Sequence, residues 1–280
     1  MISFFLFMIF IKKMFAYSLL EAQTSVWLSG AAYCNKENYE TMVLSGPANR
    51  FVVSNVLYDV RTDLQGYIGV LPTSKTIYVV FRGSVSLLNW IDDLKIKKIP
   101  YDSYPKCNCT VHDGFYTTTI HLISSIVNNI RILQKKYNYK KVIVTGHSLG
   151  GAIAQLVMME LKLYRIVSTV YNFGQPRVGD FDYSNFVTMY TNDKLYRFTH
   201  YKDMVPHIPP NDFNYYHSCM EIYENENGDF YNCSTNTCED PLCSNQFLFR
   251  ETNTQDHSTY LGHYLSCETS TKMQSTERRS

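Results

Sequence analysis

Residues 141–156 combine a short apolar strand, a tight turn and a helix, and few folds accommodate that combination. The run Val142–Val144 is β-branched, which is typical of an interior strand. Apolar residues then recur at helical spacing over residues 152–161. The turn between them, residues 146–150, reads Gly-His-Ser-Leu-Gly, so the backbone must reverse within very few residues. Such a strand–turn–helix unit favours an α/β fold.

This G-x-S-x-G turn predicts a chemical role for Ser148. The serine is held in a strained conformation, and its flanks approach too closely for a Cβ, which explains Gly146 and Gly150. The hydroxyl then points out at the carboxyl edge of the sheet, where a helix N-terminus favours developing negative charge. A flexible glycine–serine turn could carry the same five letters by chance, but the flanking strand and helix favour a nucleophile. We predict that Ser148 is the catalytic nucleophile.

Strand and helix patterns alternate along the chain, which predicts one doubly wound α/β domain over residues 17–268. Strands are expected at 51–60, 67–71, 76–81, 168–173 and 195–201, and helices at 17–33, 115–137 and 182–190. After residue 205, prolines, asparagines and cysteines predict a loop-rich region pinned by disulfides. The polar residues 269–280 are expected to form a disordered tail.

The first residues predict a targeting segment. Ile2–Ile11 is an unbroken apolar run of signal-peptide length, and we expect a cleaved signal peptide over residues 1–16. A membrane anchor, or a true start at Met14, is the alternative, because Lys12 and Lys13 follow the run instead of preceding it.

The charge balance and the cysteines indicate compartment and partners. Lys and Arg number 26 and Asp and Glu 25, so the chain has no excess of positive charge that would favour binding to nucleic acid. The even number of cysteines, without paired C-x-x-C spacing, predicts disulfides in a secreted or lumenal protein. A zinc site is the competing interpretation, but the cysteines at 233, 238 and 243 have no histidine nearby, so neither a metal nor a cofactor is predicted. Asn108 and Asn232 begin N-x-S/T sequons, which are compatible with secretion.

A serine nucleophile needs a base, itself oriented by a carboxylate. In the α/β-hydrolase arrangement these follow the serine in the order acid, then histidine, each near a strand end. Asp203 comes just past the strand at 195–201 and is the predicted acid, with Asp193 and Asp212 as alternatives. His207 and His217 follow the acid too soon to reach back across the sheet. Position alone leaves two candidates for the base, His257 and His263.

Two further features complete the expected site. The backbone N–H of Leu149 and the N–H and hydroxyl of Ser84, after the strand at 76–81, predict an oxyanion hole. The next segment, 86–94, carries apolar residues at i, i+3, i+4 and i+7. Such a stripe is commonly core packing, but beside an oxyanion loop it favours a movable lid. The stripe consists of Leu87, Trp90, Ile91 and Leu94.

These residues resemble a known family, the class 3 lipases, which include fungal triacylglycerol lipases and feruloyl esterases. The matching motifs follow the family's order over most of residues 17–267. They are Phe81-Arg82-Gly83-Ser84, Asn89-Trp90, Asp93-Leu94, His112-Asp113-Gly114-Phe115, residues 146–151, residues 173–179, Asp203-Met204-Val205-Pro206 and residues 257–262.

The resemblance implies an α/β-hydrolase fold, with a central, mostly parallel sheet flanked by helices. It selects His257 over His263, because His257 is followed by two residues, Tyr, an apolar residue and Gly. It also implies a lid at about 86–94 and the roles already assigned by position. The implied residues are Ser148, Asp203 and His257 as the triad, Ser84 and Leu149 as the oxyanion hole, and Cys34 and Cys267 as a disulfide.

One departure from the family concerns Cys107 and Cys109. The family's pair before His-Asp-Gly-Phe is spaced more widely, and a bridge from i to i+2 would strain a disulfide. One or both cysteines are therefore expected to pair within the cluster at 219–243, and the pairing of the remaining cysteines is left open.

Together these features predict a secreted, monomeric serine hydrolase that cleaves carboxylic esters of lipids through an acyl-enzyme. Its expected partners are a lipid or ester substrate at an interface and, transiently, a membrane or lipid-droplet surface. The alternatives are a feruloyl esterase or phospholipase on the same fold, and a non-catalytic lipid-binding protein.

Overall fold

The computed structural model describes residues 17–272 apart from 93, 95 and 192–193. The expected signal peptide at 1–16, the alternative acid Asp193 and the last residues of the expected tail lie outside the described residues.

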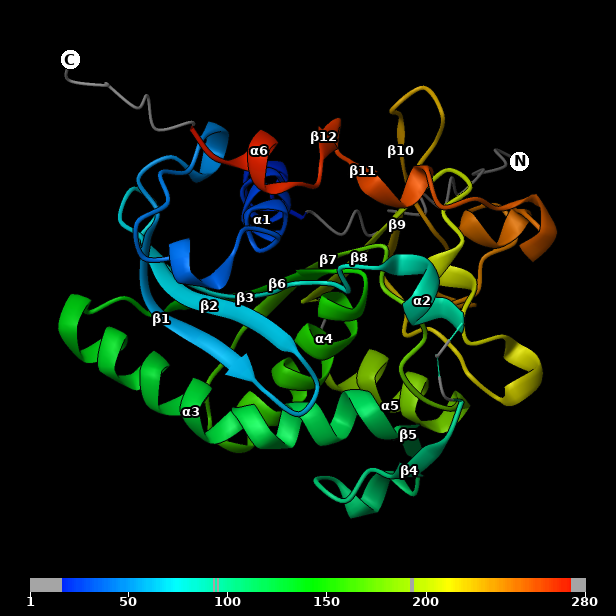
Figure 1. Cartoon of the computed structure of the whole chain (residues 1–280). Helices are drawn as coiled ribbons and strands as arrows, with labels where there is room; N and C mark the ends of the chain where they lie inside the picture. The colour runs from blue at the N-terminus through cyan, green and yellow to red at the C-terminus, as the bar shows by residue number, and fades with distance from the viewer. Residues whose placement is uncertain (1–16, 93, 95, 192–193, 273–280) are drawn as a thin grey trace, which may run out of the picture.

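The described chain is built around an eight-stranded sheet with the order β1-β2-β3-β6-β7-β8-β9-β10 (Figure 1). Strands β3, β6, β7, β8 and β9 are parallel to one another, while β1, β2 and β10 are antiparallel additions at the edges. This confirms the central, mostly parallel sheet. The strands are β1 Val52–Asp59, β2 Leu64–Leu71, β3 Thr76–Phe81, β6 Lys141–His147, β7 Thr169–Phe173, β8 Leu195–His200, β9 Glu221–Glu224 and β10 Phe230–Asn232.

Helices cover both faces of this sheet (Figure 1). They are α1 Leu19–Ala31, α2 Leu87–Asp92, α3 Asp113–Tyr137, α4 Leu149–Leu163, α5 Phe181–Tyr190 and α6 Cys267–Ser270. Two small ladders pair β4 Lys98–Pro100 with β5 Thr110–His112, and β11 Thr259–Tyr260 with β12 His263–Tyr264. Within the described residues, no helix is both long and apolar enough to span a bilayer.

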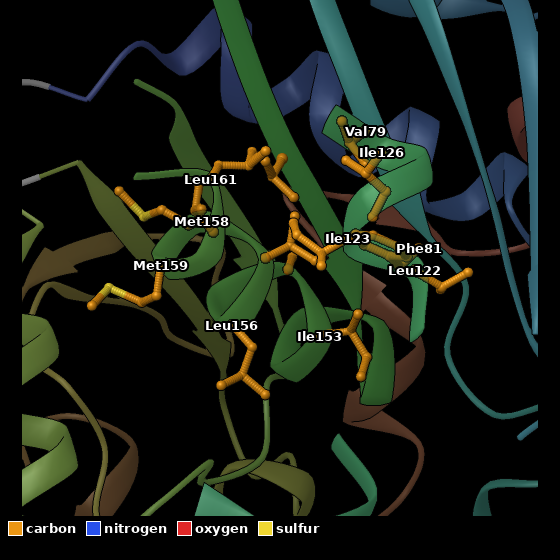
Figure 2. Packing of buried hydrophobic residues seen from close by; sticks show 14 of the residues in the cluster. Val79, Phe81, Leu122, Ile123, Ile126, Ile153, Leu156, Met158, Met159 and Leu161 are labelled. Atoms are coloured by element: carbon orange, nitrogen blue, oxygen red, sulfur yellow. The ribbon is translucent and has the colours of Figure 1, made fainter. Parts of the chain in front are cut away.

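Successive side chains of a strand face opposite sides of the sheet, which explains the two apolar layers, one on each face. In β3, Val79 and Phe81 belong to the apolar cluster shared with α3 and α4, whereas Tyr78 and Val80 belong to the cluster shared with α1. Figure 2 shows the first cluster, where α3 and α4 bring their apolar side chains together with those of β3. Because β3, β6 and β7 are buried on both faces, their sequences are almost continuously apolar.

The region after residue 205, expected to be loops, contributes two strands to the sheet. β9 is hard to recognise in the sequence because it contains Glu221 and Glu224, and charged residues are rare in interior strands. Both are buried and bonded: Glu221 accepts from the Thr199 hydroxyl at 2.7 Å, and Glu224 accepts from the Leu261 N–H at 2.8 Å. The region predicted to be loop-rich therefore also contains two strands of the sheet, which its composition did not reveal.

The expected domain boundary at residue 268 lies too early. Residues 269–272 pack against the fold: Ser270 is fully buried and bonds His263 Nε2 at 2.9 Å, and Lys272 N–H donates to the Val43 carbonyl at 2.8 Å. The prediction relied on the polarity of these residues. Hydrogen bonds and the neighbouring disulfide nevertheless hold them against the fold.

The eight cysteines form four disulfides, Cys34–Cys267, Cys107–Cys109, Cys219–Cys238 and Cys233–Cys243. The expectation that Cys107 or Cys109 pairs elsewhere is wrong. Asn108 between them adopts a left-handed conformation, with φ +50°, at the end of a 3-10 turn. This backbone brings the two Cα atoms to 5.1 Å, within the usual disulfide range.

Candidate active site

The register of the parallel strands places the predicted site residues at one edge of the sheet. Phe81 at the end of β3 pairs with Gly146 of β6, His147 pairs with Phe173 of β7, and Phe173 pairs with Phe198 of β8. Since parallel strands end at the same edge, the segments that follow them meet there.

Ser148 occupies a strained turn between β6 and α4. Its φ and ψ are 58° and −130°, a region that non-glycine residues rarely adopt. The flanking glycines are sterically required: a Cβ on Gly146 would lie 2.3 Å from the Gly150 carbonyl carbon, and one on Gly150 would lie 2.4 Å from the Phe81 oxygen. The Ser148 N–H donates to the Phe173 carbonyl at 2.9 Å, which ties the turn to β7.

Asp203 and His257 form a buried, hydrogen-bonded pair. Asp203 follows β8, His257 lies in the 3-10 helix η8 (Asp256–Ser258), and His257 Nδ1 is 2.8 Å from Asp203 Oδ2. The Val205 N–H donates to the other carboxylate oxygen at 2.8 Å. Burial alone would raise the pKa of Asp203, but the charge of His257 and the donated hydrogen bonds outweigh it and lower the pKa. The carboxyl group is therefore charged and orients the imidazole.

Tyr260 is a site residue that the analysis of individual residues missed. Its hydroxyl donates to Asp203 Oδ2, the same oxygen that His257 contacts, and the tyrosine is fully buried. The sequence signal for this contact is the position of Tyr260 three residues after His257. Because η8 leads directly into β11, both residues lie on one short segment.

His147 contacts the predicted base, His257, and the sequence did not predict this contact. Its Nε2 lies 2.7 Å from the His257 carbonyl oxygen, and its Nδ1 lies 2.6 Å from the Tyr33 hydroxyl. Burial and the neighbouring His257 lower the pKa of His147 to about 3, so the ring is neutral and carries one proton. Because the carbonyl can only accept, that proton sits on Nε2, and Tyr33 donates to Nδ1.

The predicted nucleophile and the predicted base lie close together. The His147 and His257 rings are 4.3 Å apart between centroids, and a Cβ on Gly174, next to the Phe173 carbonyl that Ser148 contacts, would lie 2.8 Å from His257 Cε1. Among the residues that the structure describes, Ser148 Oγ and His257 Nε2 are both buried and have no hydrogen-bond partner. The structure thus brings Ser148, Asp203 and His257 to the same edge of the sheet, with Ser148 Oγ and His257 Nε2 left without a partner among the described residues.

The predicted oxyanion donors flank the nucleophile. Leu149 opens α4 directly after Ser148. Gly83 packs so closely against the nucleophile that a Cβ there would lie 2.9 Å from Ser148 Cβ, and the half-buried Ser84 follows it. Both predicted donors therefore lie beside the serine.

The alternative residues lie elsewhere. The His263 ring stacks on Trp27 with 3.8 Å between centroids, on the layer with α1, and Asp212 is exposed. His217 Nε2 contacts the Pro206 carbonyl at 2.8 Å, and the His207 carbonyl accepts from Arg177 at 2.6 Å.

The predicted lid segment forms α2, which lies near the edge of the sheet where these residues meet (Figure 1). The four residues of the predicted stripe are partly buried, and Trp90 and Leu94 pack against the core, while Leu88 on the outer side is 62% exposed. A pocket of about 370 Å³ lies under this segment and reaches Leu149. Its lining residues are Thr62, Trp90, Leu94, Lys97, His112, Asp113, Gly114, Phe115, Thr117, Thr118 and Leu149.

Comparison with known proteins agrees with this geometry. Residues 78–213 match the family described as lipase (class 3). A lipase of Rhizomucor miehei is 36% identical over 196 residues, which cover 68% of this chain and 53% of that protein. A secreted mono- and diacylglycerol lipase of Fusarium solani is 32% identical over 172 residues, covering 61% of this chain and 51% of that protein. The chain thus spans about half the length of these relatives.

The similarity extends to solved structures. The Rhizomucor miehei lipase in its propeptide complex superposes with a TM-score of 0.78 at 30% identity, covering 89% of this chain and 83% of that one. A triacylglycerol lipase whose catalytic centre is a serine protease triad gives 0.80 at 29% identity, covering 90% and 98%. With its α/β-hydrolase fold and these relatives, the chain belongs to the class 3 lipase family.

Proposed function

We propose that this protein is a serine hydrolase that cleaves carboxylic esters of lipids, in the manner of a triacylglycerol lipase. The observation that carries the proposal is the buried His257–Asp203 pair, with 2.8 Å between Nδ1 and Oδ2, beside a serine held in a strained turn. Relatives named as lipases, among them the mono- and diacylglycerol lipase, support the substrate class.

Each side chain has a defined task in this reaction. Ser148 Oγ attacks the ester carbonyl while His257 Nε2 takes its proton, and Asp203 stabilises the imidazolium. The N–H of Leu149 and the polar groups of Ser84 stabilise the oxyanion. His257 then gives the proton to the leaving alcohol, and the acyl-enzyme is hydrolysed by a water that His257 activates.

The pocket beside Leu149 supports an acyl chain as the bound group. Trp90, Leu94 and Phe115 give it apolar walls, and it reaches the residue that would hold the oxyanion. The substrate would pass α2, whose Leu88 faces outward, so we propose α2 as the lid.

We further propose that the protein acts outside the cell or in a secretory lumen, as a monomer. The four disulfides support an oxidising compartment, and the Fusarium solani relative is named as secreted.

The function is tested with Ser148→Ala on a panel of triglyceride emulsions, phospholipid vesicles and dissolved aryl esters. We expect hydrolysis by the wild-type protein and a loss of several orders of magnitude, roughly 10⁴-fold or more, in the variant. Faster hydrolysis of the emulsion than of dissolved esters supports a lipase, whereas the reverse order supports a feruloyl esterase and a preference for vesicles a phospholipase.

Labelling with a fluorophosphonate separates an enzyme from a lipid-binding protein. Covalent labelling that requires Ser148 supports the hydrolase. A wild-type protein that binds lipid but is neither labelled nor active would overturn the proposal.

A further inference from the structure

Arg177 lies at the centre of a buried network that joins two loops of the site. Its guanidinium is about 3% exposed, and one nitrogen, Nη1, donates to the carbonyls of His207 at 2.6 Å and Pro209 at 3.1 Å. Its own backbone N–H donates to the Ile208 carbonyl at 2.9 Å. Arg177 therefore binds three successive carbonyl groups of residues 203–210, here called the acid loop because it begins with Asp203.

The same arginine belongs to the loop that faces the base. Gly174, three residues earlier, is so close to the triad that a Cβ there would lie 2.8 Å from Asp203 Oδ2 and from the His257 ring. Arg177 thus fastens the loop after β7 to the acid loop, and the carboxylate and the imidazole meet between them.

Glu239 completes the network from a distant part of the chain. Its two carboxylate oxygens accept from Arg177 Nε and Nη2, each at 2.8 Å, which is the bidentate geometry of the strongest ion pairs. The His217 N–H donates to the same carboxylate at 2.9 Å. Burial by itself would raise the pKa of Glu239, but the hydrogen bonds and charge of Arg177 hold it well below its usual range. The group is therefore charged, and it neutralises an arginine that would otherwise be buried alone.

A disulfide holds Glu239 in this place. Cys238 precedes Glu239 and is bonded to Cys219, two residues after His217, with 4.3 Å between the Cα atoms. The bond therefore brings Glu239 to His217 directly, although the two are far apart in the chain. The second disulfide, Cys233–Cys243, cross-links the same segment, residues 219–243, on either side of Glu239.

We propose that Glu239 is a positioning residue for the reaction. The Cys219–Cys238 disulfide holds Glu239, and Glu239 fixes Arg177. Arg177 in turn fixes the acid loop and with it the Asp203 carboxylate that orients His257. This inference rests on the proposed function. It predicts that loss of the Glu239 carboxylate lowers turnover although Glu239 does not contact the substrate, because the acid and the base no longer hold their relative placement.

The test compares Glu239→Gln with Glu226→Gln, an exposed glutamate in the same segment. Rates on a dissolved aryl ester are normalised to sites labelled by a fluorophosphonate. For Glu239→Gln we expect kcat to fall by about tenfold to a hundredfold with KM changed less than about twofold. Glu226→Gln should match the wild type, Glu239→Asp should recover part of kcat, and Cys219→Ala/Cys238→Ala should reproduce the Glu239→Gln loss.

Amide hydrogen exchange provides a readout that does not depend on activity. In Glu239→Gln, exchange should quicken by about tenfold or more at the Arg177 and Val205 amides and stay unchanged in β6. Normal kcat in a folded Glu239→Gln variant, or an equal increase in exchange throughout the protein, would overturn the positioning role. An inactive wild-type protein would instead refute the proposed hydrolase, and the exchange pattern would still decide whether Glu239 fixes the acid loop.

Discussion

At the scale of single residues, the predicted triad is buried, and two of its polar atoms, the two that would react, have no hydrogen-bond partner within the described part of the chain. Asp203 uses both carboxylate oxygens, on Val205, His257 and Tyr260. An unpaired buried polar atom is costly, so the free Ser148 Oγ and His257 Nε2 are departures that a function explains.

The two late histidines provide a prediction at this scale. His257→Ala should lower ester hydrolysis by roughly 10³-fold or more, because the imidazole is the proposed base. His263→Ala should keep kcat within about threefold and lower the free energy of unfolding instead, since the ring stacks on Trp27 and bonds Ser270. Initial rates and denaturant unfolding of both variants check this, and a larger loss of activity at His263 would reassign the base.

At the scale of elements, α2 stands out as a short helix with its apolar side turned inward and Leu88 turned outward. An exposed leucine next to a proposed active site is well placed to contact a lipid surface. α2 is not part of the sheet, so we expect it to move more readily than the strands do.

Leu88→Asp tests α2 as a lid that contacts lipid. We expect the rate on a triglyceride emulsion to fall by about tenfold while the rate on a dissolved short-chain ester stays within about twofold, since a charge at the interface opposes burial in lipid. The matched control is Val60→Asp, which changes an exposed apolar residue, 76% exposed against 62% for Leu88, in the turn between β1 and β2. Equal losses on both substrates would contradict a lid role.

At the scale of the whole molecule, the Cys34–Cys267 disulfide joins the segment after α1 to the C-terminal helix across a separation of 233 residues. Loop-closure entropy assigns such a bond roughly 5 kcal/mol, and removal of native disulfides commonly costs 2–5 kcal/mol. Cys34→Ala/Cys267→Ala should therefore lower the free energy of unfolding by about 2–5 kcal/mol, measured with denaturant. Cys107→Ala/Cys109→Ala is the control, because its loop is too short to constrain the unfolded chain, and an equal loss there would refute the entropic explanation.

Buried histidines make the stability of the molecule depend on pH. Burial lowers the pKa of His147 to about 3 and those of His207 and His263 to about 4. In the unfolded chain histidine titrates near pH 6.5, so between pH 6.5 and 4 the unfolded state binds more protons and stability falls as the pH falls. Burial raises the pKa of Glu160 and of Glu224, which opposes this trend in part.

We expect the free energy of unfolding to be lower at pH 5.0 than at pH 7.5, by about 2 kcal/mol for each histidine that stays neutral in the fold. His263→Gln should reduce that difference by about 2 kcal/mol. Denaturant titrations at both pH values measure it, and a wild-type stability that does not change between them would contradict the assignment.

Much of this molecule could be predicted from local patterns. The strand at 76–81 is observed with the predicted bounds, the helix predicted at 115–137 begins two residues earlier as α3, and the strand–turn–helix unit around Ser148 is present. Chain order also placed Asp203 and His257 at one edge of the sheet, where they form a hydrogen-bonded pair, although their catalytic roles stay a prediction. Such features follow from short-range spacing, backbone sterics and the alternation of strands and helices.

The features that the sequence could not reveal depend on contacts between distant residues. Strand β9 was hard to recognise because it contains glutamates, which are buried with donors from distant residues such as Thr199 and Leu261. The ion pair of Arg177 and Glu239 likewise joins residues 62 positions apart, and Cys238 beside Glu239 is bonded to Cys219. The sequence by itself determined the elements and the order of the reactive residues. The tertiary structure decided which buried charges are paired, because a partner far along the chain leaves no local pattern.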